Sequence, residues 1–294
     1  MAKLKIDVIP SLKRLDLVVK GLVNTKFMGN YASAFKGQGL EFYDYRFYSP
    51  SDDASRIDWK ASSRTRRLLV KEFVEERNLN VLFVLDASSK MMLGSVSHLK
   101  CEYAAEVVSS FASTILRAGD FAGLVMFSDK ITKNVIPNNG LKHYHLISDA
   151  LSELSYYGGG SNLKAVLKEI INSAEPGSLV ILLSDFIGEE NFSDELRLAG
   201  KKFDLIGIMI RDPIDMELPE GSGQARLEDP ATGEIMLVSP KNFKEIYSKE
   251  TKREVNNLSR MFRNAGADFL PLYTNKSFVE DLVAFFQRRK MGWK

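Results

Sequence analysis

Two apolar segments, Val81-Leu-Phe-Val-Leu-Asp86-Ala-Ser88 and Val180-Ile-Leu-Leu-Ser-Asp185, decide the fold of this chain. Each is a short run of large apolar residues, which is typical of a parallel strand buried on both faces. Each run ends in a carboxylate. Because open α/β sheets bind ligands just beyond the carboxyl ends of their strands, we expect Asp86 and Asp185 to lie at one functional edge of such a sheet.

Strand and helix patterns alternate from residue 79 onward, which indicates a mostly parallel sheet covered by helices on both faces. A hairpin insertion is expected near 225–238, around Asp229-Pro-Ala-Thr-Gly233. We therefore predict a Rossmann-like α/β domain over 79–294. Its strands are expected at 81–85, 121–127, 132–136, 179–183, 203–210 and 269–273, and its helices at 98–116, 144–154, 163–173, 191–198, 243–264 and 278–288.

The first 78 residues lack this alternation of strand and helix patterns, and we predict that they form a separate N-terminal segment of the chain. Residues 10–26 repeat apolar side chains at helical spacing, and the helix is expected to pack on its own domain, although a basic amphipathic helix can also lie on a membrane. The aromatic run at 40–48 and the apolar run at 68–74 predict strands, with a polar loop between them. Residues 1–78 are thus expected to be a helix followed by a β-rich segment.

Composition narrows the class of protein. The chain has 294 residues, of which 45% are hydrophobic and 27% charged, and its 40 basic and 38 acidic residues give a net charge of +2. This balance provides no global attraction to nucleic acid. The single cysteine, Cys101, excludes an intrachain disulfide and is expected to be buried. With no apolar signal core or membrane span, we expect a cytoplasmic protein that reaches a membrane only through a partner.

Hydroxyl groups accompany the two strand-end carboxylates. Ser88 follows Asp86 by two residues, and Ser161 follows the glycines of Gly158-Gly-Gly160. Together with Asp185, these side chains offer the oxygen ligands that Mg²⁺ or Mn²⁺ prefers. The sequence therefore predicts a cation site at the sheet edge.

The segment Asp86-Ala-Ser88-Ser89-Lys90 resembles the Asp-x-Ser-x-Ser motif of the metal-ion-dependent adhesion site in von Willebrand factor type A domains. The resemblance implies that Ser161 is the fourth ligand, in place of the family's Thr, and that Asp185 is the fifth. In that family the ion captures a carboxylate of a partner protein, so the resemblance implies binding and not catalysis.

Lys90 departs from the motif, because the third position is normally a serine. A protonated ammonium has no lone pair and cannot ligate a metal. Pointing inward, it would pair with Asp86 and Asp185 in place of the cation; pointing outward, it would leave Ser89 or water to complete the coordination. A site that binds Mg²⁺ or Mn²⁺ and a metal-free site satisfied by Lys90 both remain open.

A second set of residues, upstream of Asp86, resembles a bacterial and archaeal family known as domain of unknown function fifty-eight. The resemblance implies an adaptor that works with a MoxR-type AAA ATPase or its client in assembling or activating protein complexes. Tyr31, Ser51 and Ser55 depart from the family pattern. The residues that carry the resemblance are Gly37, Gly39, Glu41, Phe42, Arg46, Asp52, Asp53, Asp58, Trp59 and Arg64.

Two other functions compete with a protein-binding adaptor. A metal-dependent phosphoesterase could use Asp86 and Asp185, but neither a third carboxylate nor a general base is evident, and we expect no catalytic residues. The basic segment 56–71 could bind nucleic acid, but six acidic residues in and around it nearly cancel its charge, so we expect no such binding. These residues are Asp52, Asp53, Asp58, Glu72, Glu75 and Glu76.

The histidines do not indicate a metal centre. His143 and His145 open a predicted helix and are expected on its surface, and they lack a third ligand at metal spacing.

Overall fold

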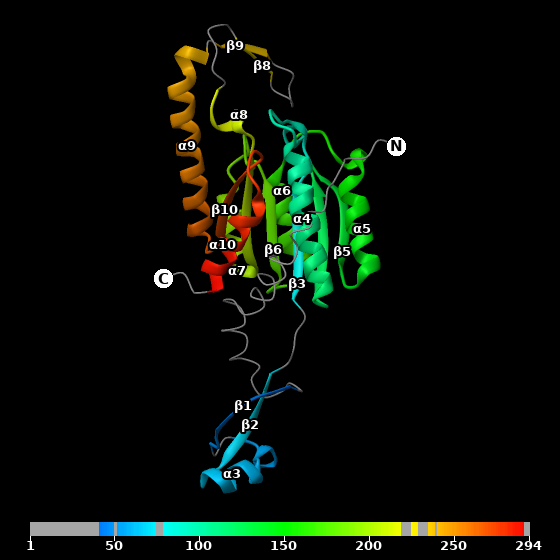
Figure 1. Ribbon diagram of the computed structural model, residues 1–294, viewed down its shortest axis with the longest axis vertical. Coiled ribbons are helices and arrows are strands. Elements are labelled where there is room, and N and C mark those ends of the chain that lie inside the picture. Colours follow the sequence, from blue (N-terminus) through cyan, green and yellow to red (C-terminus); the bar gives the residue numbers. More distant parts are fainter. Residues whose placement is uncertain are drawn as a thin grey trace.

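A six-stranded sheet forms the centre of the part of the chain that the computed structural model describes, which comprises residues 41–49, 52–74, 79–218, 225–228, 235–238 and 240–290 (Figure 1). The spatial order is β10-β7-β6-β3-β4-β5, and only β5 runs antiparallel, against β4. Counted along the chain, this is the doubly wound order 3-2-1-4-5-6, which confirms the predicted Rossmann-like sheet. The strands are β3 (Asn80–Asp86), β4 (Phe121–Phe127), β5 (Ile131–Asn138), β6 (Leu179–Ser184), β7 (Asp204–Arg211) and β10 (Asp268–Tyr273).

Helices cover both faces of this sheet, as expected (Figure 1). Alternate residues of β3 enter different cores: Val81, Phe83 and Leu85 face one, whereas Leu82 and Val84 face the other. This double burial explains why the strand is continuously apolar. The first core contains α4 (Lys100–Arg117), α5 (Leu141–Ser152) and α10 (Phe278–Lys290), and the second contains α6 (Leu163–Ser173), α7 (Ser193–Lys202) and α9 (Pro240–Asn264).

Residues 41–49 and 52–74 form a small β-rich unit around the antiparallel pair β1 (Glu41–Phe47) and β2 (Leu69–Val74), as predicted. The prediction of a polar loop between the strands is wrong, because this segment contains the 3-10 turn η1 (Ala54–Arg56) and the helix α3 (Trp59–Thr65). Asp58 caps α3 by accepting hydrogen bonds from the backbone N–H groups of Lys60 and Ala61, which explains where the helix begins.

Short elements complete the described chain. The predicted hairpin is confirmed in its strands β8 (Ala225–Glu228) and β9 (Ile235–Val238), which pair antiparallel. The helix α8 (Pro213–Met216) was not predicted; the N-cap Asp212 and the proline at its first position explain it. Two 3-10 turns, η2 (Ser89–Met92) and η3 (Leu154–Tyr156), follow β3 and α5.

The structure corrects one side-chain prediction and confirms another. His143 is buried and not on the surface, because its Nε2 lies 2.8 Å from the carbonyl oxygen of Ala122 at the start of β4. Cys101 is buried in α4, as expected. The predicted helix at 10–26, together with Gly37 and Gly39, falls outside the described residues, and the domain boundary at residue 79 stays a prediction.

Candidate functional site

The loops after β3 and β6 and the glycine loop before α6 meet at the carboxyl edge of the sheet. The hydroxyl of Ser184, at the end of β6, donates to Asp86 Oδ2 over 2.7 Å, and the backbone N–H of Ser89 donates to the carbonyl oxygen of Gly159 over 3.0 Å. The structure thus brings together the segments that carry all four predicted ligands, at the point where the strand order reverses.

Asp86 is fully buried where these segments meet, at the crevice position of a doubly wound sheet. Its Oδ1 accepts a hydrogen bond of 2.9 Å from the backbone N–H of Ser88, and its Oδ2 accepts the Ser184 hydroxyl. Burial and the nearby charge of Asp185 raise the pKa of the Asp86 carboxyl to about 6. Ser88 Oγ is buried and has no hydrogen-bond partner within the described residues.

Asp185 is also fully buried, and a lysine that was not predicted neutralises it. Lys100 Nζ, itself buried, lies 2.7 Å from Asp185 Oδ2 and 3.0 Å from Asp215 Oδ2. The other Asp185 oxygen, Oδ1, accepts the backbone N–H of Ile187 over 2.9 Å. Burial lowers the pKa of Lys100, but the two carboxylates outweigh that effect and raise it above its ordinary value, so the ammonium stays charged.

Lys90 points inward and is held by oxygens of the loop after β6. Its Nζ lies 2.6 Å from the carbonyl oxygen of Ile187, 2.8 Å from Glu189 Oε1 and 3.9 Å from Asp185 Oδ1. Its main carboxylate partner is therefore Glu189, whereas Asp185, one of the two partners expected for an inward-pointing lysine, lies farther away. Ser161 donates its hydroxyl to the same Glu189 oxygen.

Sequence reasoning missed Lys100 and Glu189. Lys100 carried a usable signal: it is the first residue of α4, where the partial positive charge of a helix start disfavours a cation. A lysine at such a position needs a carboxylate nearby, and Asp185 and Asp215 meet that need. Glu189 follows Asp185 by four residues in a loop, and nothing in its spacing showed that it would turn back toward Lys90.

The residues in this arrangement do not fit a divalent cation. Three of the four predicted ligands already bond within the protein: Asp86 to Ser184, Asp185 to Lys100 and Ser161 to Glu189. A metal ion ligated by Asp185 would lie close to two fixed ammonium groups and would be repelled by both. Among the described residues, no three His, Cys, Asp or Glu side chains are grouped so that they could hold a metal.

The ion network extends to the end of β7. Asp212 accepts hydrogen bonds from the backbone N–H of Ser95 over 2.9 Å, from the Ser95 hydroxyl and from the Thr274 hydroxyl over 3.0 Å. Burial raises the pKa of Asp212, but these hydrogen bonds outweigh that effect and keep the pKa below its ordinary value. The loop that precedes α4 is therefore bound to the start of α8 through the hydrogen bonds of Ser95 to Asp212. Lys100, the first residue of α4, is bound to α8 through Asp215.

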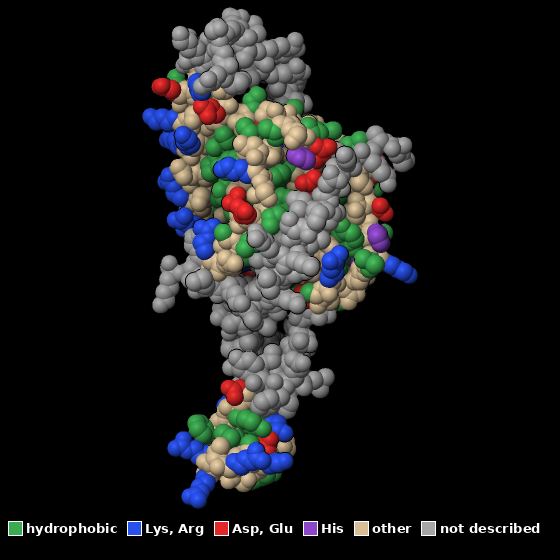
Figure 2. Space-filling view, viewed as in Figure 1, with side chains coloured by type: hydrophobic (Ala, Val, Ile, Leu, Met, Phe, Trp, Pro, Cys, Tyr) green, Lys and Arg blue, Asp and Glu red, His purple; other side chains and the backbone are tan. Residues whose placement is uncertain are grey.

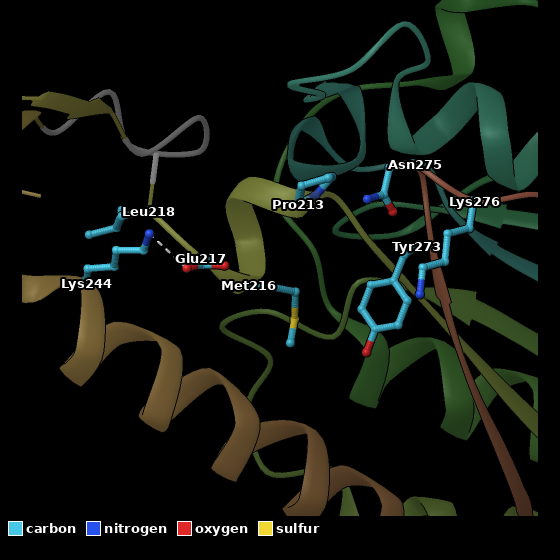
Figure 3. A pocket seen from close by; sticks show the side chains of 8 residues that line it. All are labelled: Pro213, Met216, Glu217, Leu218, Lys244, Tyr273, Asn275 and Lys276. Carbon is cyan, nitrogen blue, oxygen red and sulfur yellow. Dashed lines mark ion pairs between the residues drawn. The ribbon is translucent and has the colours of Figure 1, made fainter. Parts of the chain in front are cut away.

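A concave surface of about 550 Å³ lies beside α8, the first part of α9 and the end of β10 (Figure 3). Figure 3 shows Lys244 and Glu217 pointing toward each other across it, 3.1 Å apart. None of the predicted ligands lines this cavity, so it is distinct from the crevice. Its lining residues are Pro213, Met216, Glu217, Leu218, Lys244, Tyr273, Asn275 and Lys276.

The upstream signature residues form structural contacts within the small unit. Arg46 pairs with Asp52 through two hydrogen bonds of 2.5 and 2.6 Å, and Asp53 caps η1. Asp58 accepts the Tyr45 hydroxyl over 2.9 Å. The side chains of Glu41 and Phe42 lie outside the description.

The basic segment is partly neutralised by its acidic neighbours. Lys71 lies 3.2 Å from Asp58, whereas Trp59 is exposed. On the face drawn in Figure 2, Lys and Arg side chains gather along the edge formed by α9 and on the small unit. Among the side chains of α9 that the structure describes, the exposed cations are Lys249, Lys252, Arg253, Arg260 and Arg263.

None of the helices in the described chain has both the length and the apolar character needed to cross a bilayer.

Two curated proteins and one solved structure illustrate what this chain is similar to. "Uncharacterized protein Mb1516" of Mycobacterium bovis is 25% identical over 287 residues, which cover 96% of this chain and 90% of that protein. "Uncharacterized protein YeaD" of Bacillus subtilis is 30% identical over 100 residues, or 34% of this chain and 23% of that protein. The crystal structure of the conserved hypothetical protein BatB from Bacteroides thetaiotaomicron matches 73% of this chain and 100% of its own at 14% identity and a TM-score of 0.49.

The family profile gives the strongest assignment. The profile described as "Protein of unknown function DUF58" matches residues 44–257, well over half of the chain. The region includes both the upstream signature from Arg46 onward and the crevice. The chain therefore belongs to the DUF58 family, and its doubly wound sheet with one antiparallel edge strand is von Willebrand factor type A-like.

Proposed function

We propose that this protein is a non-enzymatic adaptor that binds another protein at the carboxyl edge of its sheet. The observation that carries the proposal is the convergence of polar side chains from η2, α4, the glycine loop and the loop after β6 on one crevice. Met92 and Leu93, at the end of η2, are 37% and 43% exposed beside it. Exposed apolar side chains next to fixed charges are a frequent feature of protein-binding surfaces.

The proposed partner is a MoxR-type AAA ATPase or its client, as the family resemblance implies. Lys90 supports a partner that offers a carboxylate, because it is the more exposed of the two lysines: 16% of its side chain is exposed, against 1% for Lys100. An acidic side chain of the partner could share this ammonium with Glu189.

A phosphoesterase is the competing proposal, and the local contacts give it little support. Both carboxylates that it would use are buried and bonded, Asp86 to Ser184 and Asp185 to Lys100. Generic phosphoesters with Mg²⁺ or Mn²⁺ provide the test. Turnover that disappears in Asp86→Ala would replace the adaptor proposal with an enzyme.

Binding to a purified MoxR-type ATPase from the same genome tests the adaptor proposal. The variants Met92→Asp and Leu93→Asp change the exposed rim and leave the ion pairs intact; each is expected to weaken binding by at least ~10-fold. The matched control is Lys142→Glu, an exposed change on α5 at the opposite edge of the sheet. Equal affinities for the rim variants and the wild type would exclude this edge as the contact.

Asp185→Ala is a less clean test of the same contact. Asp185 is buried against Lys100, so its removal leaves an ammonium buried with only Asp215 as partner. Such changes cost several kcal/mol of stability, on the order of 3–5 kcal/mol. A loss of binding in this variant therefore has to be read together with its unfolding curve.

A further inference from the structure

We infer that Lys90 and Lys100 together take the place of a divalent cation, so that this crevice is complete without Mg²⁺ or Mn²⁺. The two ammonium groups carry the same total charge as one divalent ion. Lys90 reaches from the loop after β3 to the loop after β6, and Lys100 binds Asp185, the residue that the motif would use as a metal ligand.

Lys90 occupies a position surrounded by oxygen atoms. The carbonyl oxygen of Ile187 and Glu189 Oε1 lie within hydrogen-bond distance of its Nζ, at 2.6 and 2.8 Å, and Asp185 Oδ1 lies at 3.9 Å. Two carboxylates and a carbonyl are also what a hard cation prefers. The lysine at the third motif position thus delivers its charge to an oxygen-lined position that a metal ion would otherwise be suited to fill.

Lys100 neutralises the other half of the crevice. It is 1% exposed and bridges Asp185 and Asp215, so it connects the end of β6 to α8. The side chain of Asp185 is 0% exposed, so water cannot solvate its charge and a cation of the protein has to balance it. A divalent ion added beside these two lysines would be repelled by both ammonium groups. The carboxylates that it would bind, Asp185 and Glu189, are already paired with the lysines.

The inference does not depend on the identity of a partner, because the protein alone can be tested. Thermal unfolding is measured with Mn²⁺ and with a chelator for the wild type, for Lys90→Ser and for Lys168→Ser. Lys90→Ser empties the oxygen-lined position and restores the motif hydroxyl. Lys168→Ser is the matched control, since it removes a lysine that pairs with Glu195 over 3.5 Å on the surface of α6.

Mn²⁺ should leave the melting temperatures of the wild type and of Lys168→Ser unchanged and raise that of Lys90→Ser by roughly 2–4 °C at ten times its dissociation constant. Failure of Mn²⁺ to stabilise a folded Lys90→Ser would refute the assignment of that position to the cation. Isothermal titration of the wild type keeps the inference open to refutation even if the variant does not fold: stoichiometric Mn²⁺ binding with a dissociation constant below ~1 mM would overturn it.

Discussion

Lys100 is the single residue on which the electrostatics of the crevice depend most. It is a buried cation at the start of a helix, a position that helix electrostatics disfavour, and its two carboxylate partners come from distant parts of the chain. Such a pair contributes little net stability over an apolar pair, yet the loss of one partner leaves an uncompensated charge.

Lys100→Met is therefore expected to lower the free energy of unfolding by about 3–5 kcal/mol, because Asp185 would remain buried without its cation. Urea denaturation measures the change. The control Lys168→Met removes a surface ion pair and should cost less than about 1 kcal/mol. Similar losses in the two variants would contradict the importance assigned to the buried pair.

Asp86 predicts a specific pH dependence of stability. Its pKa is about 6 in the folded protein against an ordinary value of 3.8, so between these values the folded state binds more protons than the unfolded state. Stability should therefore be highest below about pH 4 as far as this group is concerned, and should fall by on the order of 3 kcal/mol as the pH rises through 6 to about 7.

Urea denaturation at a series of pH values, for the wild type and for Asp86→Asn, isolates this contribution, because the amide does not titrate. Between pH 4 and about pH 7 the wild type should lose stability relative to Asp86→Asn, and the difference between the two should stay constant above about pH 7. Parallel curves across this interval would show that Asp86 titrates normally.

Residue identities at strand ends could be predicted, whereas their partners could not. Asp86 and Asp185 were found because an apolar run that stops at a carboxylate is a local pattern. The hydrogen bond from Ser161 to Glu189 and the ion pair from Lys100 to Asp185 join segments that are 28 and 85 residues apart. Such pairings depend on how the helices and loops pack, which no local spacing encodes.

At the scale of elements, α7 and α9 pack so closely that a glycine is required between them. A Cβ atom added to Gly200 would lie 2.1 Å from the carbonyl oxygen of Ala265, a backbone atom that cannot move aside without shifting the end of α9. A similar close approach occurs in β7, where a Cβ on Gly207 would meet the Phe262 ring at 2.2 Å. Both contacts hold α9 against the second core.

Gly200→Ala separates the helix propensity of the residue from its packing. Propensity alone would stabilise α7 by about 1 kcal/mol, because alanine is the better helix former. The collision with Ala265 is expected to dominate, with a net loss of roughly 1–2 kcal/mol in the free energy of unfolding. Chemical denaturation gives the sign directly, and a variant more stable than the wild type would contradict the close packing of α7 on α9.

The elements that could be predicted are those with long periodic patterns. The buried strands β3 and β6 and the helix α6 were predicted to within a residue or two, because their apolar spacing is unambiguous. The helix α3 was missed because Asp58 was interpreted as part of a polar loop, and not as an N-cap. The four-residue helix α8 was too short for any periodicity to show.

At the scale of the whole molecule, the strand order determines where the polar groups meet. The order reverses between β3 and β6, so the loops after these two strands diverge at the carboxyl edge and leave room for side chains between them. The doubly wound sheet could be predicted from the alternation of strands and helices. The orientation of the Lys90 side chain could not be predicted, because its ammonium group could be stabilised by carboxylates inside the protein or by water outside it.

The central claim is that lysines, and not a metal ion, neutralise this crevice. A crystal structure from crystals grown with excess Mn²⁺, with data collected for anomalous scattering of manganese, tests it most directly. We expect no anomalous peak among Asp185, Glu189 and Ser161, and we expect Lys90 to remain in contact with Glu189 and Lys100 with Asp185. A manganese peak within ligand distance of these oxygens, with either lysine displaced, would contradict it.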